Sequence, residues 1–258
     1  MAKTRSEYVL DGRQHILLQG LPKTGKTTLA LQFSRPYLID VDNNIAGAIQ
    51  GSQLKDRDFK WDTPLERPVR DPKTKALTGE IEIIDPIKDP VGYEERFRAI
   101  FDEAFKDPDV DTVILDSATA ITNMFVNAIC KRANKPAMEI QLWQNFIKYW
   151  IDMITIAKSK HKRVVLIAHE ELYEDKIDGG TKRMLLLPSK ARATIPGMFS
   201  DVWETYVASK MVSGKPTYEH MIRCKADNKV SGLGASHPAA KPSFSATWDE
   251  VSKVLNAK

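Results

Sequence analysis

The stretch HILLQGLPKTGKTTLALQF, residues 15–33, decides the fold class. It begins as a short apolar run that ends at Gly20, which is typical of a buried β-strand. From Gly20 to Thr27 it fits the pattern G-x-x-x-x-G-K-[ST] without a gap, and a segment with helical apolar spacing follows. Strand, glycine-rich turn and helix in this order predict a loop whose backbone amides hold phosphate groups.

Each residue type in this turn has a physical reason. Glycines let the backbone bend so that several N–H groups point inward, Lys26 can reach the β- and γ-phosphates, and the Thr27 hydroxyl can bind Mg²⁺. Thr28 is expected near the α-phosphate, whereas Lys23 is either a further phosphate contact or a solvated loop lysine. The expected nucleotide contacts are Gly20, Leu21, Pro22, Lys23, Thr24, Gly25, Lys26, Thr27 and Thr28. The alternative is a glycine-rich turn that binds no ligand.

Further apolar runs follow along the chain, and we expect them to be strands. They cover residues 36–42, 111–119, 162–170, 201–209 and 216–225. Most are rich in Val, Ile and Leu without alternation, which is typical of parallel strands covered on both faces. Amphipathic helices are predicted over 91–106, after Asp89-Pro90, and over 141–160. The alternation predicts an α/β fold with a mostly parallel sheet and helices on both faces.

The predicted domain organisation is a core of residues 1–235 followed by a linker and short helix in 236–258. Residues 52–88, rich in Pro, Lys, Asp and Arg, interrupt the core as an insertion, with a hairpin expected to close near Thr78-Gly79. Residues 173–197 begin as a polar, glycine-bearing loop of the kind that often carries function. The terminal helix is expected to dock on the core through Trp248, Val251, Val254 and Leu255.

Composition limits the class of protein. The 258 residues are 42% hydrophobic and 28% charged, with a formal charge of +4 and pI near 8.9, which permits contact with phosphate backbones without requiring it. No run of about 18 apolar residues is present, and the N-terminus lacks the apolar segment of a secretory signal. Cys130 and Cys224 are far apart, which fits a reducing cytoplasm better than a disulfide framework or a zinc site.

Acidic residues and a histidine end three of the predicted strands. Asp116 ends DTVILD, where it can hold Mg²⁺ directly or through a water, or simply cap a helix. Asp40 and Asp42 share a face two residues apart, and Asp42 should project beyond the strand. His169 and Glu170 end another strand, and His169 is either a γ-phosphate sensor or a hydrogen-bonded surface residue.

The segments LLQGLPKTGKTTLALQF, YLIDVDNNI, DTVILDSATAI and VVLIAHEEL, in this order, resemble the RecA-like P-loop ATPase core. More closely they resemble phage-encoded AAA-type ATP-binding proteins of the single-strand annealing and recombination group. The resemblance covers about residues 13–230. It implies ATP and Mg²⁺ as ligands, single-stranded DNA as a partner, a ring or filament of identical subunits, and a location in the cytoplasm of a bacterial host.

Site residues carry over from the resemblance one by one. Residues 20–28 would bind the phosphates, and Asp116 would be the acid beside the metal. Asp42 falls where such proteins usually carry a catalytic glutamate, and it is one methylene shorter. His169 falls at a glutamine sensor position that is often histidine in the phage group. With Lys26, these two make up the expected catalytic set, and the segment 173–197 would touch single-stranded DNA.

Basic residues provide the remaining candidates. Lys225 and Lys229 fall, by a loose match, where lysines of a neighbouring subunit reach across to the nucleotide. The candidate DNA contacts, which could equally be a solvated charged loop, are Lys182, Arg183, Lys190 and Arg192.

Three functions are compatible with these features. The first is an ATPase that binds single-stranded DNA in phage-type recombination, annealing or replication, with a single-strand-binding protein or a helicase as a further partner. The second is a nucleotide or small-molecule kinase with a lid in 52–88 that bears Arg57, Arg67 and Arg70. The third is an adaptor that loads a helicase, although Asp116-Ser117 departs from the Asp-Glu that normally ends the acidic strand of AAA+ loaders.

Overall fold

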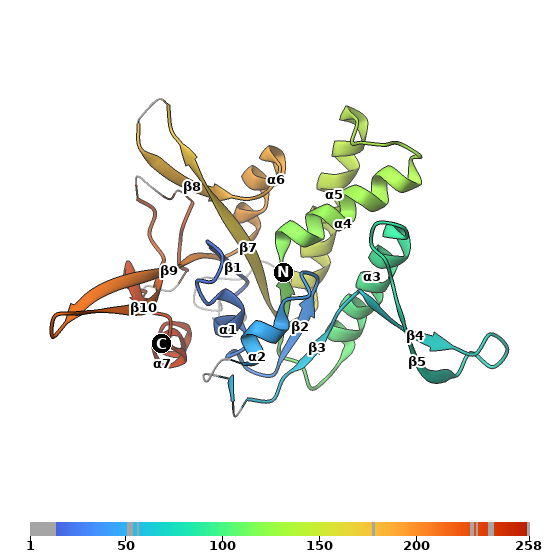
Figure 1. Cartoon of the computed structure of the whole chain (residues 1–258), viewed down its shortest axis with the longest axis horizontal. Coiled ribbons are helices and arrows are strands. Elements are labelled where there is room, and N and C mark those ends of the chain that lie inside the picture. The colour runs from blue at the N-terminus through green and yellow to red at the C-terminus, as the bar shows by residue number, and fades with distance from the viewer. Residues whose placement is uncertain are drawn as a thin grey trace, which may run out of the picture.

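The computed structural model describes residues 14–50, 54–55, 57–176, 179–227, 230, 232–236 and 240–256. Figure 1 shows a central sheet with helices packed on both of its faces. The strands are β1 Ile16–Gly20, β2 Pro36–Asp40, β3 Lys60–Asp62, β4 Glu66–Arg70, β5 Leu77–Ile83, β6 Thr112–Asp116, β7 Arg163–Glu174, β8 Thr181–Leu185, β9 Asp201–Val212, β10 Lys215–Arg223 and β11 Ser243–Ser245. The helices are α1 Lys26–Ala30, α2 Ile45–Ile49, α3 Pro90–Lys106, α4 Ala118–Arg132, α5 Ile140–Ser159, α6 Ser189–Thr194, the 3₁₀ turn η3 Pro196–Met198 and α7 Trp248–Asn256.

The main sheet has the order β11-β10-β9-β1-β7-β6-β2-β3, and β8 pairs with β7. The strands from β9 to β3 in this order run parallel, whereas β10, β11 and β8 are antiparallel to their neighbours. The predicted mostly parallel α/β sheet with helices on both faces is confirmed. The prediction of a parallel strand at 216–225 is wrong, because a two-residue turn at Ser213-Gly214 returns the chain directly beside β9.

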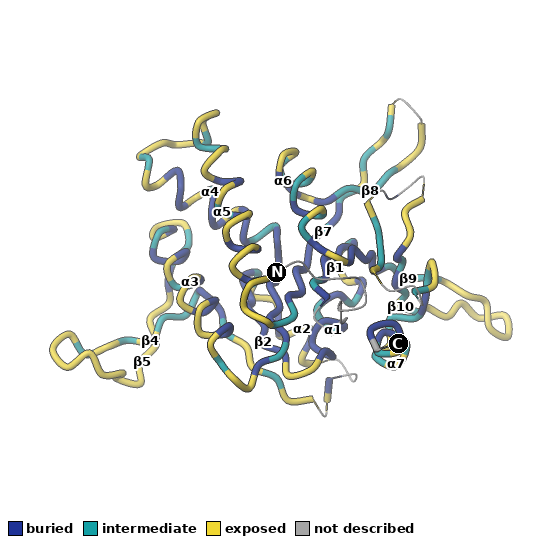
Figure 2. Tube along the Cα trace, turned by 180° about the vertical axis from the view of Figure 1, so that it is seen from behind, coloured by how far each residue is buried: buried dark blue, intermediate teal, exposed yellow. Residues whose placement is uncertain are grey.

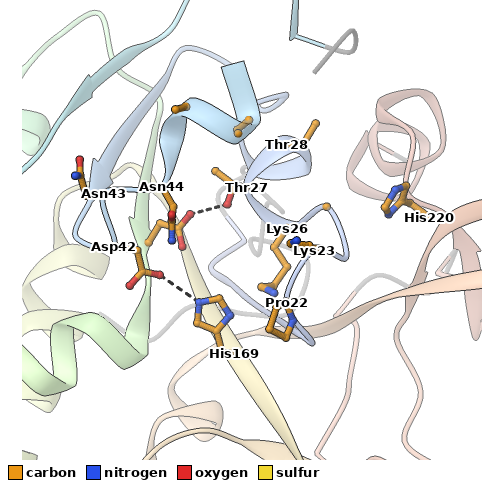
Figure 3. Close-up of a pocket in the computed structure, with 15 residues that line it drawn as sticks. Pro22, Lys23, Lys26, Thr27, Thr28, Asp42, Asn43, Asn44, His169 and His220 are labelled. Atoms are coloured by element: carbon orange, nitrogen blue, oxygen red, sulfur yellow. Dashed lines mark hydrogen bonds and ion pairs between the residues drawn. The ribbon is translucent and has the colours of Figure 1, made fainter. Parts of the chain in front are cut away.

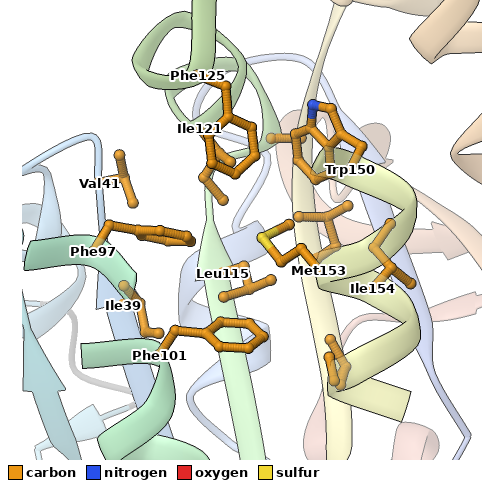
Figure 4. Close-up of a cluster of buried hydrophobic side chains, with 14 of the residues drawn as sticks. Ile39, Val41, Phe97, Phe101, Leu115, Ile121, Phe125, Trp150, Met153 and Ile154 are labelled. Atoms are coloured by element: carbon orange, nitrogen blue, oxygen red, sulfur yellow. The ribbon is translucent and has the colours of Figure 1, made fainter. Parts of the chain in front are cut away.

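Two apolar cores lie on opposite faces of the sheet. One packs α3, α4, α5 and α6 against the sheet, with Phe97, Phe125 and Trp150 at its centre (Figure 4). The other packs α1, α2 and α7 against the opposite face. Successive strand residues alternate between the two cores, so every residue at a strand end has an assigned face. That assignment decides which polar side chains meet.

The two segments that interrupt the core order form hairpins. Within residues 52–88, β3 joins the edge of the main sheet beside β2, while β4 and β5 pair as a separate two-stranded arm. The arm turns at 71–76 and not near Thr78-Gly79, as predicted from the glycine. Asp71 accepts hydrogen bonds from the backbone of Lys73 and Thr74, so an Asp-Pro turn determines the register.

Residues 173–197 are not a loop in the structure. The strand β7 continues to Glu174 and pairs with β8, and α6 follows. Helix α4, which sequence reasoning missed, begins directly after β6, with the Ser117 hydroxyl accepting from the Ala120 amide. Figure 2 shows that the β4–β5 and β9–β10 arms extend from opposite sides of the molecule and are largely exposed.

The C-terminal helix docks on the core as expected. In α7, Val251, Val254 and Leu255 are buried in the same core as α1. The Trp248 ring meets Phe33 edge to face, with ring centroids 5.3 Å apart. In the described part of the chain, none of the helices combines the length and the apolar character that crossing a membrane requires.

Candidate functional site

A cavity of about 680 Å³ opens at the carboxyl ends of β1, β2, β6 and β7 (Figure 3). Its volume falls in the range of small-ligand sites. The lining residues are Pro22, Lys23, Gly25, Lys26, Thr27, Thr28, Asp42, Asn43, Asn44, Ala46, Gly47, Ala48, Asp116, His169 and His220. Most of the glycine-rich turn and the three expected polar residues from other strands therefore meet in one place.

The turn after β1 has the backbone that the motif requires. Gly25 has φ +87°, which favours glycine, and a Cβ on Gly20 would lie 2.5 Å from the Thr205 carbonyl oxygen. The Thr24 hydroxyl donates to the Leu21 carbonyl at 2.8 Å and lies 2.7 Å from the Thr205 hydroxyl. Neighbouring strand β9 thus supports the loop from behind.

The Lys26 ammonium is buried inside the loop. It donates to the carbonyls of Gly20 and Leu21 at 2.9 and 2.8 Å. Burial lowers the pKa of Lys26, while the charges of Asp116, Glu170 and Asp42 oppose that shift. An anion in the cavity would favour the charged form of this side chain, which is the electrostatic condition for a phosphate ligand.

Two oxygen donors suited to a hard cation lie side by side. The Thr27 hydroxyl donates to Asp116 Oδ2 at 2.6 Å, joining the start of α1 to the end of β6. Burial raises the pKa of Asp116 to about 6, and the charges of Asp42 and Asp40 add to the rise. A divalent cation beside this carboxylate would offset that cost. The residues therefore fit a Mg²⁺ ion bound together with phosphate oxygens.

The two acids at the end of β2 have different environments. Asp40 is 1% exposed, and its carboxylate accepts from the backbone amides of Asn44 and Ile45, which fixes the start of α2. Asp42 lies beyond the strand end and lines the cavity. The sequence left both acids open and favoured Asp42, and the geometry places only Asp42 where it can face a ligand.

Asp42 and His169 contact each other across the cavity. His169 Nε2 lies 3.2 Å from Asp42 Oδ2 (Figure 3), and because a carboxylate only accepts, Nε2 carries the proton. The Tyr93 hydroxyl donates to the Val41 carbonyl at 3.0 Å and so helps fix the segment that carries Asp42. The roles proposed for Asp42 and His169 stay predictions.

Three polar cavity residues escaped sequence reasoning. Asn43 and Asn44 follow Asp42 directly, and strand-end asparagines beside a phosphate loop were a usable signal. His220 belongs to β10, and its Nδ1 lies 3.0 Å from the Thr24 carbonyl oxygen across 196 residues of sequence. No local pattern could have placed it there.

Buried charges lie on the opposite face of the same strand ends. Gln19 donates to Glu170 at 2.8 Å, and Glu170 is 3% exposed. Glu204, fully buried, pairs with Arg183 of β8 and lies 3.3 Å from Arg223 of β10. Burial, followed by the charge of Glu204, raises the pKa of Glu170 to about 7.

The candidate DNA contacts separate into two pairs. Arg183 is held by Glu204, and Arg192 donates to the Leu187 carbonyl at 2.9 Å, so both guanidinium groups bind within the protein. Lys182 pairs with Asp175 near the end of the β7–β8 hairpin, and Lys190 is exposed on α6. The last two are better placed to meet a ligand from solution.

The other predicted groups lie outside the cavity. Lys225 is exposed just after β10, and Lys229 lies outside the described residues. Among the described residues of 52–88, none lines the cavity, and Arg67 pairs with Glu82 on the arm itself. The arginine-bearing lid that a kinase would need is therefore not assembled at this site.

Comparison with known proteins gives one family and several distant structures. The model of the AAA domain family matches residues 13–232. A KaiC-like protein of Pyrococcus horikoshii is 12% identical, with 81% of this chain and 78% of that chain covered and a TM-score of 0.40. The flagellar accessory protein FlaH of Methanocaldococcus jannaschii gives 11%, 81%, 76% and 0.35, and the ATPase domain of a third protein gives 9%, 81%, 81% and 0.33. No curated protein matched the chain.

Proposed function

Because the chain belongs to the AAA domain family, we propose that it is a Mg²⁺-dependent ATPase whose nucleotide state governs its binding to single-stranded DNA. One observation carries the proposal. The phosphate loop, the Thr27–Asp116 pair and the Asp42–His169 pair converge in a single cavity at the carboxyl end of a parallel sheet. This is the donor set that phosphoryl transfer to water requires.

The residues divide the work of binding. The loop amides and Lys26 would hold the β- and γ-phosphates, and Thr27 and Asp116 would hold Mg²⁺. When bound, Mg²⁺ supplies charge neutralisation on the phosphate oxygens. The buried ammonium would exchange its two carbonyl partners for phosphate oxygens, since a charge-assisted bond to phosphate is the stronger one.

Asp42 is the proposed water-orienting group. Of the two acids that end the LIDVD segment, it is the one that lines the cavity, and its contact with His169 fixes one carboxylate oxygen while the other can accept from a water. An aspartate reaches less far than a glutamate, so we expect slow turnover. Slow turnover would suit a nucleotide-controlled switch.

His169 links the cavity to the proposed DNA-binding hairpin. It lies on β7, the same strand that continues to Glu174 and forms the hairpin with β8. A contact between His169 and the γ-phosphate would be lost on hydrolysis, so the two nucleotide states would hold β7 differently. DNA that binds one arrangement better would then be coupled to ATP.

We propose Lys182 and Lys190 as the DNA contacts, with Arg183 and Arg192 holding the hairpin and α6 in place. Basic side chains of this kind neutralise backbone phosphates, which makes binding salt-dependent. The proposal includes a ring or filament of identical subunits, in which Lys225 and Lys229 reach a neighbour's nucleotide. The biological setting that we propose is phage-type recombination, annealing or replication.

The test is the ATPase rate with and without single-stranded DNA at two salt concentrations. We expect DNA to raise the rate, and the higher salt to weaken that effect. Equal rates with and without DNA would refute the coupling. A phosphorylated small-molecule product would indicate a kinase instead, and a stable complex with a helicase would indicate a loading adaptor.

A further inference from the structure

The cavity has two distinguishable ends, if the proposed function is correct. Asp42, Asp116 and His169 gather on one side of the phosphate loop, where the Lys26 motif places the β- and γ-phosphates and the metal. The nucleoside must then leave the loop on another side. The lining residues of the described chain include no Phe, Tyr or Trp, so the cavity itself offers the base no large aromatic surface.

His220 marks the opposite rim of the loop. Figure 3 shows it on the far side of the phosphate loop from Asp42 and His169. Its Nδ1 lies 3.0 Å from the Thr24 carbonyl oxygen, which can only accept, so Nδ1 donates. A Cβ on Gly25 would lie 3.2 Å from the same ring. The β9–β10 arm is thus attached to the loop where the loop enters α1.

An apolar surface continues from His220 along the arm. In the antiparallel ladder, His220 lies opposite Val207, and Tyr218 is the next residue of β10 on the same face. Val207 is 43% exposed and Tyr218 is 73% exposed. Since His220 points at the loop, the face that carries Val207 and Tyr218 borders the cavity. Exposed apolar side chains grouped beside a polar cavity indicate a ligand surface.

The other wall of the cavity is a weaker candidate for the base. It is formed by α2 at Ala46, Gly47 and Ala48, three small residues. Helix α2 follows Asp42 and Asn43 closely, so it borders the end where the γ-phosphate would lie. A nucleotide extended across the loop would place its base away from that end.

We propose that the β9–β10 arm receives the nucleoside. His220 positions the phosphate loop through Thr24, and the face formed by Tyr218 and Val207 contacts the base. The ligand is a nucleoside triphosphate whose base stacks on Tyr218 and whose phosphates enter the loop. The arm is consequently part of the nucleotide site, and its aromatic ring contributes affinity that a bare phosphate chain cannot use.

Calorimetric titration of the full chain with Mg·ATP and with inorganic tripolyphosphate tests this directly. Tyr218→Ala should weaken ATP binding by about tenfold, as expected for loss of one base–aromatic stack, and should leave tripolyphosphate binding unchanged. Tyr218→Phe keeps the ring and should bind ATP like the unmodified chain. Thr217→Ala, one residue away on the opposite face of the arm, is the matched control and should change neither affinity.

Equal weakening of both ligands by Tyr218→Ala, or of neither, would overturn the proposal. Photolabelling with 8-azido-ATP gives a second test that needs no variant. The label should appear on the tryptic peptide of residues 211–223, and a label confined to α2 would place the base on the wrong wall. If the unmodified chain bound tripolyphosphate but labelled nowhere near β10, this inference alone would fail. Binding of neither ligand would refute the proposed function as well.

Discussion

The strand ends of the sheet carry acids on both faces, and the two sets differ in what surrounds them. On the α1 face, Asp42 and Asp116 border an open cavity with His169. On the opposite face, Glu170 and Glu204 are buried, and Gln19 and arginines of two other strands reach them. His169 and Glu170 are neighbours in sequence, yet the alternation of the strand sends them to different faces.

The difference shows what each set of charges can do. The open acids have hydroxyl and imidazole partners and, among the described residues, no Lys or Arg ion pair, so a cation and a nucleotide can complete them. The buried acids receive their positive charge from the protein itself, chiefly from Arg183 of the β7–β8 hairpin. The open face is suited to chemistry, and the closed face to holding the hairpin beside the site.

Lys26→Ala should give the largest effect and act on the open face alone. Loss of the buried ammonium of the loop should abolish detectable binding of Mg·ATP, measured by calorimetry. Lys23→Ala removes an exposed lysine of the same loop and is the matched control, with a far smaller effect expected. Retained tight binding in Lys26→Ala would refute the site.

Arg183→Ala should break the closed face and spare the open one. Removing one partner of a buried ion pair costs about 3–5 kcal/mol of unfolding free energy, because Glu204 loses its nearest cation. Arg67→Ala, which removes an exposed pair with Glu82, should cost about 0–1 kcal/mol. Urea unfolding compares the two variants, and equal values would mean that the buried pair has no special weight.

Glu170→Gln should change the pH dependence of stability. The pKa of Glu170 rises from 4.5 to about 7 on folding, so the folded chain holds a proton that the unfolded chain releases. Stability from this group is therefore present below about pH 4.5 and is lost as the pH rises through 7. The rise corresponds to roughly 3 kcal/mol.

The measurement is urea unfolding of both chains between pH 5 and 8. We expect Glu170→Gln to be more stable than the unmodified chain at pH 8, with the gap shrinking toward pH 5. A gap that did not change with pH would show that Glu170 ionises normally in the folded chain.

Asp42→Asn should give the smallest change in free energy and affect turnover only. The amide keeps the size of the side chain, so Mg·ATP affinity should be close to that of the unmodified chain. The ATPase rate should fall about a hundredfold, which is the lower range for loss of a general base. Full turnover in this variant would assign the water to another residue.

Local pattern alone determined the phosphate loop, the acid at Asp116 and the parallel strands. Each of these is specified within about ten consecutive residues, where glycine torsions, helix capping and apolar runs act on the backbone directly. The same local logic failed at the β4–β5 turn, where Asp71 outweighed the Thr78-Gly79 signal. It also missed α4, although Ser117 caps it.

Only the tertiary structure decided which distant side chains meet. Gln19 and Glu170 are 151 residues apart, and Thr24 and His220 are 196 apart. Their contacts depend on strand order and register, which bring β9, β1 and β7 side by side. The sequence therefore specified the part of the site that binds phosphate, because that part is local. The parts that support it and border it arise from long-range pairing, which no single segment encodes.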